Sequence, residues 1–510
     1  MFGRGLLVLC MSIVAWGQYG AMTDDPGDAP AAHAPAPAVD RTILDAYALL
    51  DRQEFKKAAT EFAALAQSAP TSIEAQLGLV RALFQTGEFG AAALAGENAA
   101  RLNPKSVAIH AMLADVYFRR GWFAAAEQQY KAALALDGNS GRAWIGLGKI
   151  YSIRSMTNDA RTAFENARQS APQLFSGWLA ALTTPEQRAT FLRYAVPDQA
   201  PRVDACEISF ADIEEPASQR AQTHEIPLEP IRDIKGNVRG MGMKARISGQ
   251  TRALMMLDTG ASGITIGSRL AKKAGLLNAS DRQLAGMGGS GTASGYSADV
   301  ARLQIGNVEL RNCTVQVAPD KLMLSQDAII GTDVFQKYLI TLDFPVRKLR
   351  ISERSSQPAF EERVKAAQLT QIQAYRFAHM LLVPSTIGQG ASGLFVLDSG
   401  ANINTVSERL MPKVGGMTAM PRFVEGTAGT VNSALGANSV AVKLGAIELL
   451  QQNVASVDLS SVSKRLGTEV AGQIGLSSLE NFRIDIDYKT GTLVFERAAT
   501  AVGVAASVGQ

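Results

Sequence analysis

Two short segments of this 510-residue chain place a carboxylate in the same setting, LDTGA at 257–261 and LDSGA at 397–401. Each follows an apolar run that predicts a buried strand ending at the aspartate, and the glycine lets the backbone approach and donate an N–H to the carboxylate. Two carboxyl groups that face each other within about 3 Å cannot easily both ionise, so they share a proton. Such a pair can take a proton from water and stabilise the oxyanion that forms when this water attacks a carbonyl group. The two segments therefore make Asp258 and Asp398 the candidates for such a pair.

The second half of the chain repeats itself around these two aspartates. When they are aligned, residues 254–275 lie over 394–415 without a gap, and an Ile-Gly pair at 330–331 matches one at 474–475. Short alternating apolar runs punctuated by glycine predict strands in both copies. The predicted units are a first lobe at 226–354, an interlobe linker at 355–371, a second lobe at 372–498 and a tail at 499–510.

This duplicated pattern resembles the retropepsin-like aspartic proteases, in particular bacterial members whose motif is Asp-Thr-Gly-Ala, over residues 240–498. Two lobes in one chain would make an all-β, pepsin-like pseudo-dimer. The resemblance implies an aspartic endopeptidase that acts on a polypeptide substrate and needs no metal and no cofactor. It also implies that the Thr or Ser of each motif hydrogen-bonds across to the other lobe. The residues that it assigns to the site are the catalytic Asp258 and Asp398 and the supporting loop residues Thr259, Gly260, Ser399 and Gly400.

Each predicted lobe also contains a glycine-rich segment, at 285–296 and 424–436. These segments match the position of the flap in the same family, a hairpin that closes over the substrate, excludes water and hydrogen-bonds to an extended peptide. An ordinary flexible loop is the alternative for both segments. The candidate flap residues are Gly288, Gly289, Gly291, Tyr296, Gly426 and Gly429.

Alanine follows each motif glycine, at Ala261 and Ala401. Pepsin-type enzymes usually have Ser or Thr there, and its hydroxyl can donate to the carboxylate. Alanine cannot, and the loss of a donor to the charged form raises the pKa of a carboxyl group. We therefore expect activity at mildly acidic rather than strongly acidic pH.

Two alternatives stay open for the β-rich half. The second lobe reads Asn-Ile-Asn at 402–404 where the first reads Ser-Gly-Ile at 262–264. A closed or misaligned cleft could therefore silence the dyad and leave a peptide-binding scaffold in the cell envelope. The lobes could also pair between chains rather than within one chain.

The first half of the chain has a different pattern, a 34-residue repeat between about 39 and 174. An aromatic residue follows a recurring alanine by four positions in three copies, and Gly96 is the exception. This resembles the tetratricopeptide repeat, an all-α solenoid that packs small residues of one helix against large residues of the next. We expect four repeats and a capping helix at 175–194, within a helical unit at 39–194 that a linker at 195–225 follows. The recurring alanines are Ala58, Ala92, Ala126 and Ala160.

The concave surface of such an array usually holds a peptide or a partner protein, so we expect a protein partner there. A spacer or an intramolecular brace is the alternative. The net charge of +3, without a dense Lys/Arg block, does not indicate nucleic acid. The chain has no His-Glu-x-x-His, paired Cys-x-x-Cys or phosphate-loop motif, so metalloprotease and nucleotide-binding functions have no support.

The N-terminus has the features of an export signal. Arg4 precedes an apolar run at 6–16 that is too short to span a bilayer comfortably, and small residues follow it. We expect a signal peptide at 1–21 and a flexible Pro/Ala-rich spacer at 22–38, hence an exported protein, periplasmic or secreted. An uncleaved N-terminal membrane anchor is the alternative.

Two cysteines remain beyond the predicted signal, Cys206 and Cys313. An exported protein permits a disulfide, but two distant cysteines do not form the kind of framework that marks a disulfide-rich protein. We therefore expect these two cysteines to stay unpaired.

Overall fold

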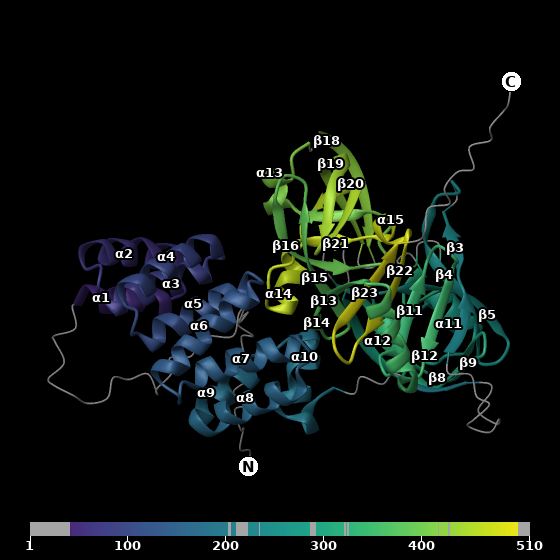
Figure 1. The fold of residues 1–510 in the computed structure, drawn as a ribbon, viewed down its shortest axis with the longest axis horizontal. Coiled ribbons are helices and arrows are strands. Elements are labelled where there is room, and N and C mark those ends of the chain that lie inside the picture. Colours follow the sequence, from purple (N-terminus) through teal and green to yellow (C-terminus); the bar gives the residue numbers. More distant parts are fainter. Residues whose placement is uncertain are drawn as a thin grey trace, which may run out of the picture.

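The computed structural model has an all-α part followed by a mostly β part, as the sequence predicts (Figure 1). It describes residues 41–201, 206–210, 223–233, 235–285, 292–320, 323, 326–416, 418–426 and 429–497. The predicted signal segment and spacer lie outside the described residues, and so do the candidate flap residues Gly288, Gly289 and Gly291. Within the described ranges, no helix is both long and apolar enough to cross a bilayer.

Helices α1 to α10 form the first part, and each packs closely on its neighbours because small residues face large ones. A Cβ at Gly78 would overlap the ring of Phe62, and a Cβ at Gly146 would overlap the ring of Tyr130. Both rings are fully buried. The helices are α1 Arg41–Asp51, α2 Phe55–Ser68, α3 Ile73–Gln85, α4 Phe89–Leu102, α5 Val107–Arg119, α6 Phe123–Leu136, α7 Gly141–Ile153, α8 Thr157–Ser170, α9 Pro172–Ala181 and α10 Pro185–Ala195.

The array ends in two helices, α9 and α10, where the sequence predicts one capping helix at 175–194. Pro185 begins α10, and the Thr184 hydroxyl accepts a hydrogen bond from the Gln187 N–H at 3.2 Å. Proline suits the first turn of a helix because an N–H there has no partner within the helix. The proline and its threonine cap therefore end the previous helical segment and start a new helix.

The β part has one sheet for each lobe. The first-lobe strands are β1 Glu207–Phe210, β3 Glu229–Arg232, β4 Val238–Ile247, β5 Thr251–Asp258, β6 Ile264–Gly267, β7 Ser280–Ala285, β8 Thr292–Ile305, β9 Val308–Ala318 and β10 Ala328–Gly331. The second-lobe strands are β14 Tyr375–Phe377, β15 Met380–Ile387, β16 Ala391–Leu397, β17 Asn404–Ser407, β18 Thr418–Gly426, β19 Gly429–Leu444, β20 Ile447–Val457 and β21 Gly472–Ile474. Their spatial orders are β1-β9-β6-β10-β5-β4-β8-β7, with β3 paired to β4, and β14-β15-β16-β21-β17-β20-β19-β18. Short helices connect them: α11 Ser268–Lys273, α12 Gln357–Ala366, α13 Met411–Val414, α14 Ser460–Leu466 and α15 Leu476–Leu479.

A third sheet joins the two lobes. Its strands, in spatial order, are β13 Thr370–Gln373, β23 Thr492–Arg497, β22 Phe482–Asp487, β11 Leu339–Asp343, β12 Lys348–Ser352 and β2 Thr223–Pro227. Strands β11 and β22 pair antiparallel at the boundary between the lobes, with Ile340 opposite Ile486. Three strands lie on the β22 side of this pair and three on the β11 side. The sheet therefore has an approximate twofold axis between β11 and β22.

Both segments that the sequence predicts to be linkers carry regular structure. Residues 195–225 contribute β1 and the start of β2, and residues 355–371 contain α12 and the start of β13. Phe210 of β1 is buried, and its ring stacks on that of His224 with centroids 3.7 Å apart. These strands are short, and their partners β9 and β12 lie far along the chain, so local sequence patterns do not reveal them.

The helical part packs against the second lobe through a shared apolar cluster and buried hydrogen bonds (Figure 1). The rings of Phe123 and Tyr375 lie 4.6 Å apart. The Arg119 guanidinium donates to the Ser463 carbonyl at 2.8 Å. Part of the surface of the array is therefore occupied by the same chain.

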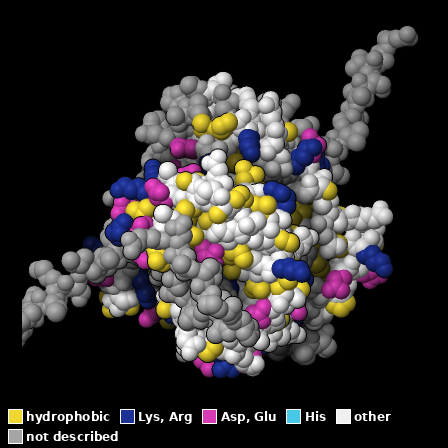
Figure 2. Space-filling view, turned by 90° about the vertical axis from the view of Figure 1, so that its left-hand side faces the viewer, with side chains coloured by type: hydrophobic (Ala, Val, Ile, Leu, Met, Phe, Trp, Pro, Cys, Tyr) yellow, Lys and Arg dark blue, Asp and Glu magenta, His cyan; other side chains and the backbone are white. Residues whose placement is uncertain are grey.

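The end of the helical part that lies away from the second lobe carries a surface of mixed polarity. Figure 2 views the molecule from the side on which the first helices lie. Basic, acidic and hydrophobic side chains are interspersed over this face. Leu94 is among the exposed apolar residues of this part, at 70% exposure. A mixed surface of this kind agrees with the nearly neutral net charge.

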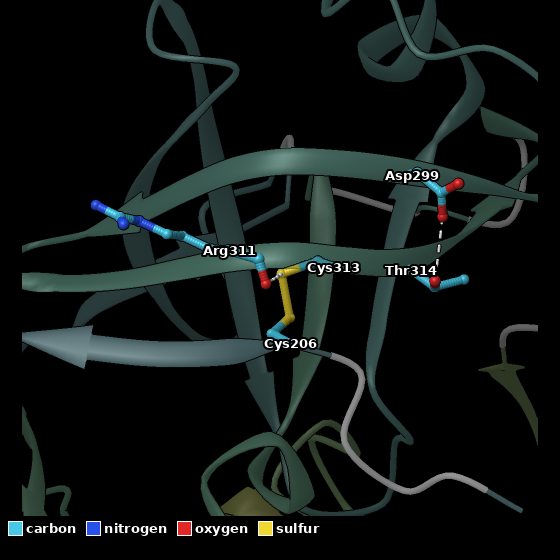
Figure 3. Close-up of a disulfide and its surroundings, with 5 residues drawn as sticks. All are labelled: Cys206, Asp299, Arg311, Cys313 and Thr314. Carbon is cyan, nitrogen blue, oxygen red and sulfur yellow. Dashed lines mark hydrogen bonds between the residues drawn. A yellow bond between two sulfur atoms is a disulfide. The ribbon is translucent and has the colours of Figure 1, made fainter.

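Cys206 and Cys313 form a disulfide (Figure 3), so the expectation that they stay unpaired is wrong. Strand β1 pairs antiparallel with β9 and sets Glu207 opposite Arg311. This register carries Cys206 to the buried Cys313, with 4.2 Å between their Cα atoms. Sequence spacing hid the pairing because 107 residues separate the two cysteines.

We predict that reduction of this disulfide destabilises the first lobe. A bond that closes a loop of this length restricts the unfolded chain, and its loss typically costs ~2–4 kcal/mol. Calorimetry should show a lower unfolding temperature for the wild-type protein in reductant and the same lower value for Cys206→Ser. The variant should not respond to reductant, and an unchanged wild-type transition in reductant would contradict the prediction.

Candidate active site

The two motif aspartates lie at equivalent positions at the ends of buried strands. Strand β5 ends at Asp258, β16 ends one residue before Asp398, and the two residues are 8% and 9% exposed. The Ile-Gly strand of each lobe runs parallel to the aspartate strand, so that Gly331 lies opposite Asp258 and Ile474 lies opposite Leu397. Each motif loop is therefore supported by a central strand of its own lobe.

Four hydrogen bonds cross between the two motif loops. The Thr259 hydroxyl donates to the Leu397 carbonyl at 2.7 Å and accepts from the Ser399 N–H at 2.9 Å. The Ser399 hydroxyl donates to the Leu257 carbonyl at 3.1 Å and accepts from the Thr259 N–H at 3.1 Å. Both side chains are buried. The loops are thus held in one relative position, and in this structure the lobes pair within a single chain.

These crossing bonds bring the two carboxyl groups face to face, within hydrogen-bonding reach of each other. A Cβ at Gly400 would overlap the Asp258 carboxylate, and a Cβ at Gly260 would lie 2.8 Å from Asp398 Cγ, so glycine alone fits at both positions. Each glycine also donates its N–H to the aspartate of its own motif, at 2.7 Å in the first loop and 3.1 Å in the second. The Ala401 N–H adds a further bond to Asp398 at 3.0 Å.

The electrostatics of the pair favour a shared proton. Burial raises the pKa of Asp258. Burial and the nearby charge of Asp258 together raise the pKa of Asp398 well above its usual range. The backbone N–H donors act in the opposite direction but do not cancel these effects. Because both shifts are upward, the pair retains one proton to a higher pH than two separate carboxyl groups would.

A glutamine that the sequence analysis missed also belongs to this site. Gln473 of β21 donates its Nε2 to Asp398 Oδ2 at 2.6 Å, and its Oε1 accepts from the Thr405 hydroxyl at 3.0 Å. All three residues are buried. The equivalent residue of the first lobe is Ile329. A polar residue in an otherwise apolar strand was the available signal, and the alignment of the two lobes displays it.

Another buried carboxyl group holds the backbone that follows the first motif. Asp333 accepts hydrogen bonds from the Gly263 N–H at 3.0 Å and from the Ser262 hydroxyl at 3.2 Å. Burial raises the pKa of Asp333 to about 6. Its neighbour Thr332 is hydrogen-bonded to the Tyr488 hydroxyl at 2.7 Å, which ties the loop to the second lobe.

The turn between β14 and β15 reaches the first-lobe loop from the second lobe. Burial lowers the pKa of His379 to about 4, and the nearby backbone of Gly260 acts on this pKa in the opposite direction. The preceding residue, Ala378, has a φ of 54°, a left-handed conformation that is unfavourable for a residue with a side chain. Its N–H donates to the hydroxyl of Thr190 in α10 at 2.9 Å. The helical part therefore holds the turn between β14 and β15.

The described candidate flap residues belong to two hairpins, one in each lobe. Gly426 and Gly429 pair with each other at the tip of the β18–β19 hairpin. Tyr296 lies on β8 opposite Asp281 of β7 and lines a surface hollow with Leu277.

Each lobe has a further aspartate at the end of a strand, Asp343 of β11 and Asp487 of β22, and each of them forms an ion pair. Asp343 pairs with Arg350, and Asp487 pairs with Arg354, both at 2.6 Å. Over the part of the chain that the structure describes, no group of three or more His, Cys, Asp or Glu side chains is placed to hold a metal ion.

Comparison with known families gives matches in both parts of the chain. Residues 243–334 match the family described as aspartyl protease, a segment that runs from β4 through the first motif to the Ile-Gly strand. Residues 44–107 and 107–150 match tetratricopeptide repeat families. The chain thus consists of tetratricopeptide repeats followed by an aspartic-protease-like domain. A search of curated proteins found no match to the chain.

We predict that Thr259→Val destabilises the paired lobes. Valine keeps the shape of threonine but leaves the Leu397 carbonyl and the Ser399 N–H without their partner, at about 1–3 kcal/mol for each buried group. Calorimetry should show a lower unfolding temperature for the β part. Thr314→Val is a matched control, because Thr314 bonds to Asp299 at an exposed site and its loss should cost less than about 0.5 kcal/mol. Equal effects of the two changes would contradict the prediction.

We also predict that Asp333 makes stability depend on pH. Its pKa is raised in the folded protein, so its contribution is complete below about pH 4 and is lost as the pH rises through about 6. Asp333→Asn should therefore reduce the decline in the free energy of unfolding between pH 4 and 7, by up to about 3 kcal/mol. Parallel pH profiles of the wild-type and variant proteins would show that Asp333 does not cause the decline.

Proposed function

We propose that this protein is an aspartic endopeptidase in which Asp258 and Asp398 share one proton and activate one water molecule. The observation that carries the proposal is the meeting of two buried carboxyl groups, one from each of two equivalent loops, with both pKa values raised. The match of residues 243–334 to the aspartyl protease family supports the same assignment.

In the proposed reaction, the ionised member of the dyad takes a proton from the water, and the water oxygen attacks the carbonyl carbon of a peptide bond. The protonated member hydrogen-bonds to the carbonyl oxygen and stabilises the negative charge of the tetrahedral intermediate. A proton then passes to the amide nitrogen, the carbon–nitrogen bond breaks, and an amine and a carboxylic acid leave. The dyad ends with the one proton it had at the start. The chemistry needs neither a metal ion nor a covalent intermediate.

The rest of the chain suggests where and on what the enzyme acts. We propose that the part of the array that the second lobe leaves uncovered binds a protein or peptide and presents it to the protease half, because tetratricopeptide arrays usually bind such ligands. We also propose that the protein is exported, periplasmic or secreted. A disulfide persists in oxidising compartments, and the first 21 residues resemble a signal peptide.

We predict cleavage of a peptide library by the wild-type protein without its signal segment, with a maximum between about pH 4 and 7. Upward pKa shifts of both carboxyl groups move the singly protonated state of the dyad to higher pH than two ordinary carboxyl groups would have. Asp258→Asn and Asp398→Asn should each lower the rate by on the order of 10²–10⁴-fold. A statine-type transition-state mimic should inhibit the wild-type protein. Mass spectrometry of the products measures the cleavage.

The matched control for these variants is Asp299→Asn, which changes an exposed carboxylate of the first lobe and should leave the rate unchanged. A maximum below about pH 3 would contradict the assigned pKa directions. If the wild-type protein and both dyad variants bind peptides equally and none cleaves them, the protein is instead a catalytically silent peptide-binding scaffold.

A further inference from the structure

The two halves of the dyad differ in one respect that their near-identical motifs do not suggest. Asp398 Oδ1 accepts the N–H groups of Gly400 and Ala401, and Asp398 Oδ2 accepts the amide of Gln473 at 2.6 Å. Both oxygens of this carboxylate therefore have donors from its own lobe. In the first lobe, the position equivalent to Gln473 is Ile329, which cannot donate. The asymmetry thus lies in the Ile-Gly strand rather than in the motif.

The amide of Gln473 is oriented rather than free to rotate. The Thr405 hydroxyl donates to Gln473 Oε1 at 3.0 Å, which fixes the side chain with its NH₂ group toward Asp398. Strand β21 carries Gln473 between β16 and β17, opposite Val396 and Thr405 in the two registers. An amide held in this way donates to the carboxylate without losing further conformational freedom.

The equivalent side chain of the first lobe has a different role. Ile329 is 2% exposed and packs in an apolar cluster with Ile231, Met256 and Leu284. An apolar residue thus satisfies the packing requirement at this position of the strand. A polar residue in its place would be unfavourable without hydrogen-bond partners, and Gln473 has partners on both sides.

We propose that Gln473 is a positioning residue of the dyad, which holds Asp398 in place and stabilises its charged form through Oδ2. Ala401 has no hydroxyl with which its side chain could do so. Because only Asp398 has an oriented side-chain donor from its Ile-Gly strand, the carboxylate oxygens of the two aspartates differ in environment. The shared proton therefore favours one position over the other. The kinetic consequence rests on the proposed proteolysis, whereas the effect on the titration of the dyad does not.

Other ionisable groups near the dyad could also affect its titration. They come from three neighbouring elements: His379 from the β14–β15 turn, Tyr488 from the turn after β22, and Asp333 from the segment after β10. None of them donates to Asp398 in the described structure, and Gln473 itself does not ionise. A change at Gln473 that leaves these groups in place therefore isolates the effect of its amide.

The test compares Gln473→Met, which keeps the length of the side chain but removes the donor, with Ile329→Met at the equivalent first-lobe position. The titration of the dyad is followed by NMR of protein labelled with ¹³C at the aspartate carboxyl carbons, with Asp398→Asn to assign the signal. Gln473→Met should raise a macroscopic pKa of the dyad by about one unit, because a hydrogen bond to the charged form of Asp398 is lost. Ile329→Met should leave it unchanged.

Activity provides the second readout. Gln473→Met should lower kcat about tenfold with little change in KM and move the pH–rate profile upward by about one unit. Gln473→Glu can donate only while its own carboxyl group is protonated, so its activity should be confined to the acidic side of the wild-type profile.

The outcomes separate this inference from the proposed function. A shifted titration in Gln473→Met supports the positioning role, even if the wild-type protein cleaves no peptide and the proposed proteolysis fails. An unshifted titration overturns the positioning role, whether or not the protein is active. Loss of folding in Gln473→Met is recognised by calorimetry. In that case Thr405→Val, which releases the amide from its orientation, should produce a smaller shift in the same direction, and no shift would overturn the inference.

Discussion

The exchange of hydrogen bonds between Thr259 and Ser399 is the constraint on which the rest of the site depends. Each hydroxyl donates to a backbone carbonyl of the opposite lobe and accepts a backbone N–H from it. A hydroxyl group can do both at once, and few other side chains of this size can. The two carboxyl groups are adjacent because these four bonds fix the relative position of the loops that carry them. The antiparallel pairing of β11 and β22 in the shared sheet joins the two lobes as well.

The geometry also explains why glycine must follow in both motifs. Each carboxylate occupies the space in which a side chain of the opposite loop would otherwise lie, as the contacts of Gly260 and Gly400 show. The cost of this close approach is electrostatic, because two buried acids face each other. The structure offsets part of it with backbone N–H donors, and the remainder appears as the raised pKa values. The close approach of the two carboxyl groups thus costs stability, and it also makes the pair retain the proton that the proposed chemistry uses.

The sequence predicted the order of the two parts and the type of each, because a 34-residue repeat and a duplicated strand-Asp-Gly pattern are regular signals. It did not predict the bond between Cys206 and Cys313 or the short strand β1, since each depends on a partner far along the chain. The role of Gln473 depends on a contact from a neighbouring strand, and a search for motifs alone does not reveal such a contact. The docking of the helices on the second lobe depends on surface complementarity, which neither repeat pattern encodes locally.

The shared apolar cluster has a consequence for how the protein can be divided. Leu382, Leu394 and Val396 of the second lobe are almost fully buried, and they belong to the same cluster as residues of the helical array. A fragment that began after α10 would leave this side of the second lobe bare, and contiguous bare apolar surface promotes self-association. It would also lose Thr190, whose hydroxyl accepts the N–H of Ala378, a residue in the left-handed conformation. The helices therefore cover one side of the second lobe and support its β14–β15 turn, so that removing them would expose both.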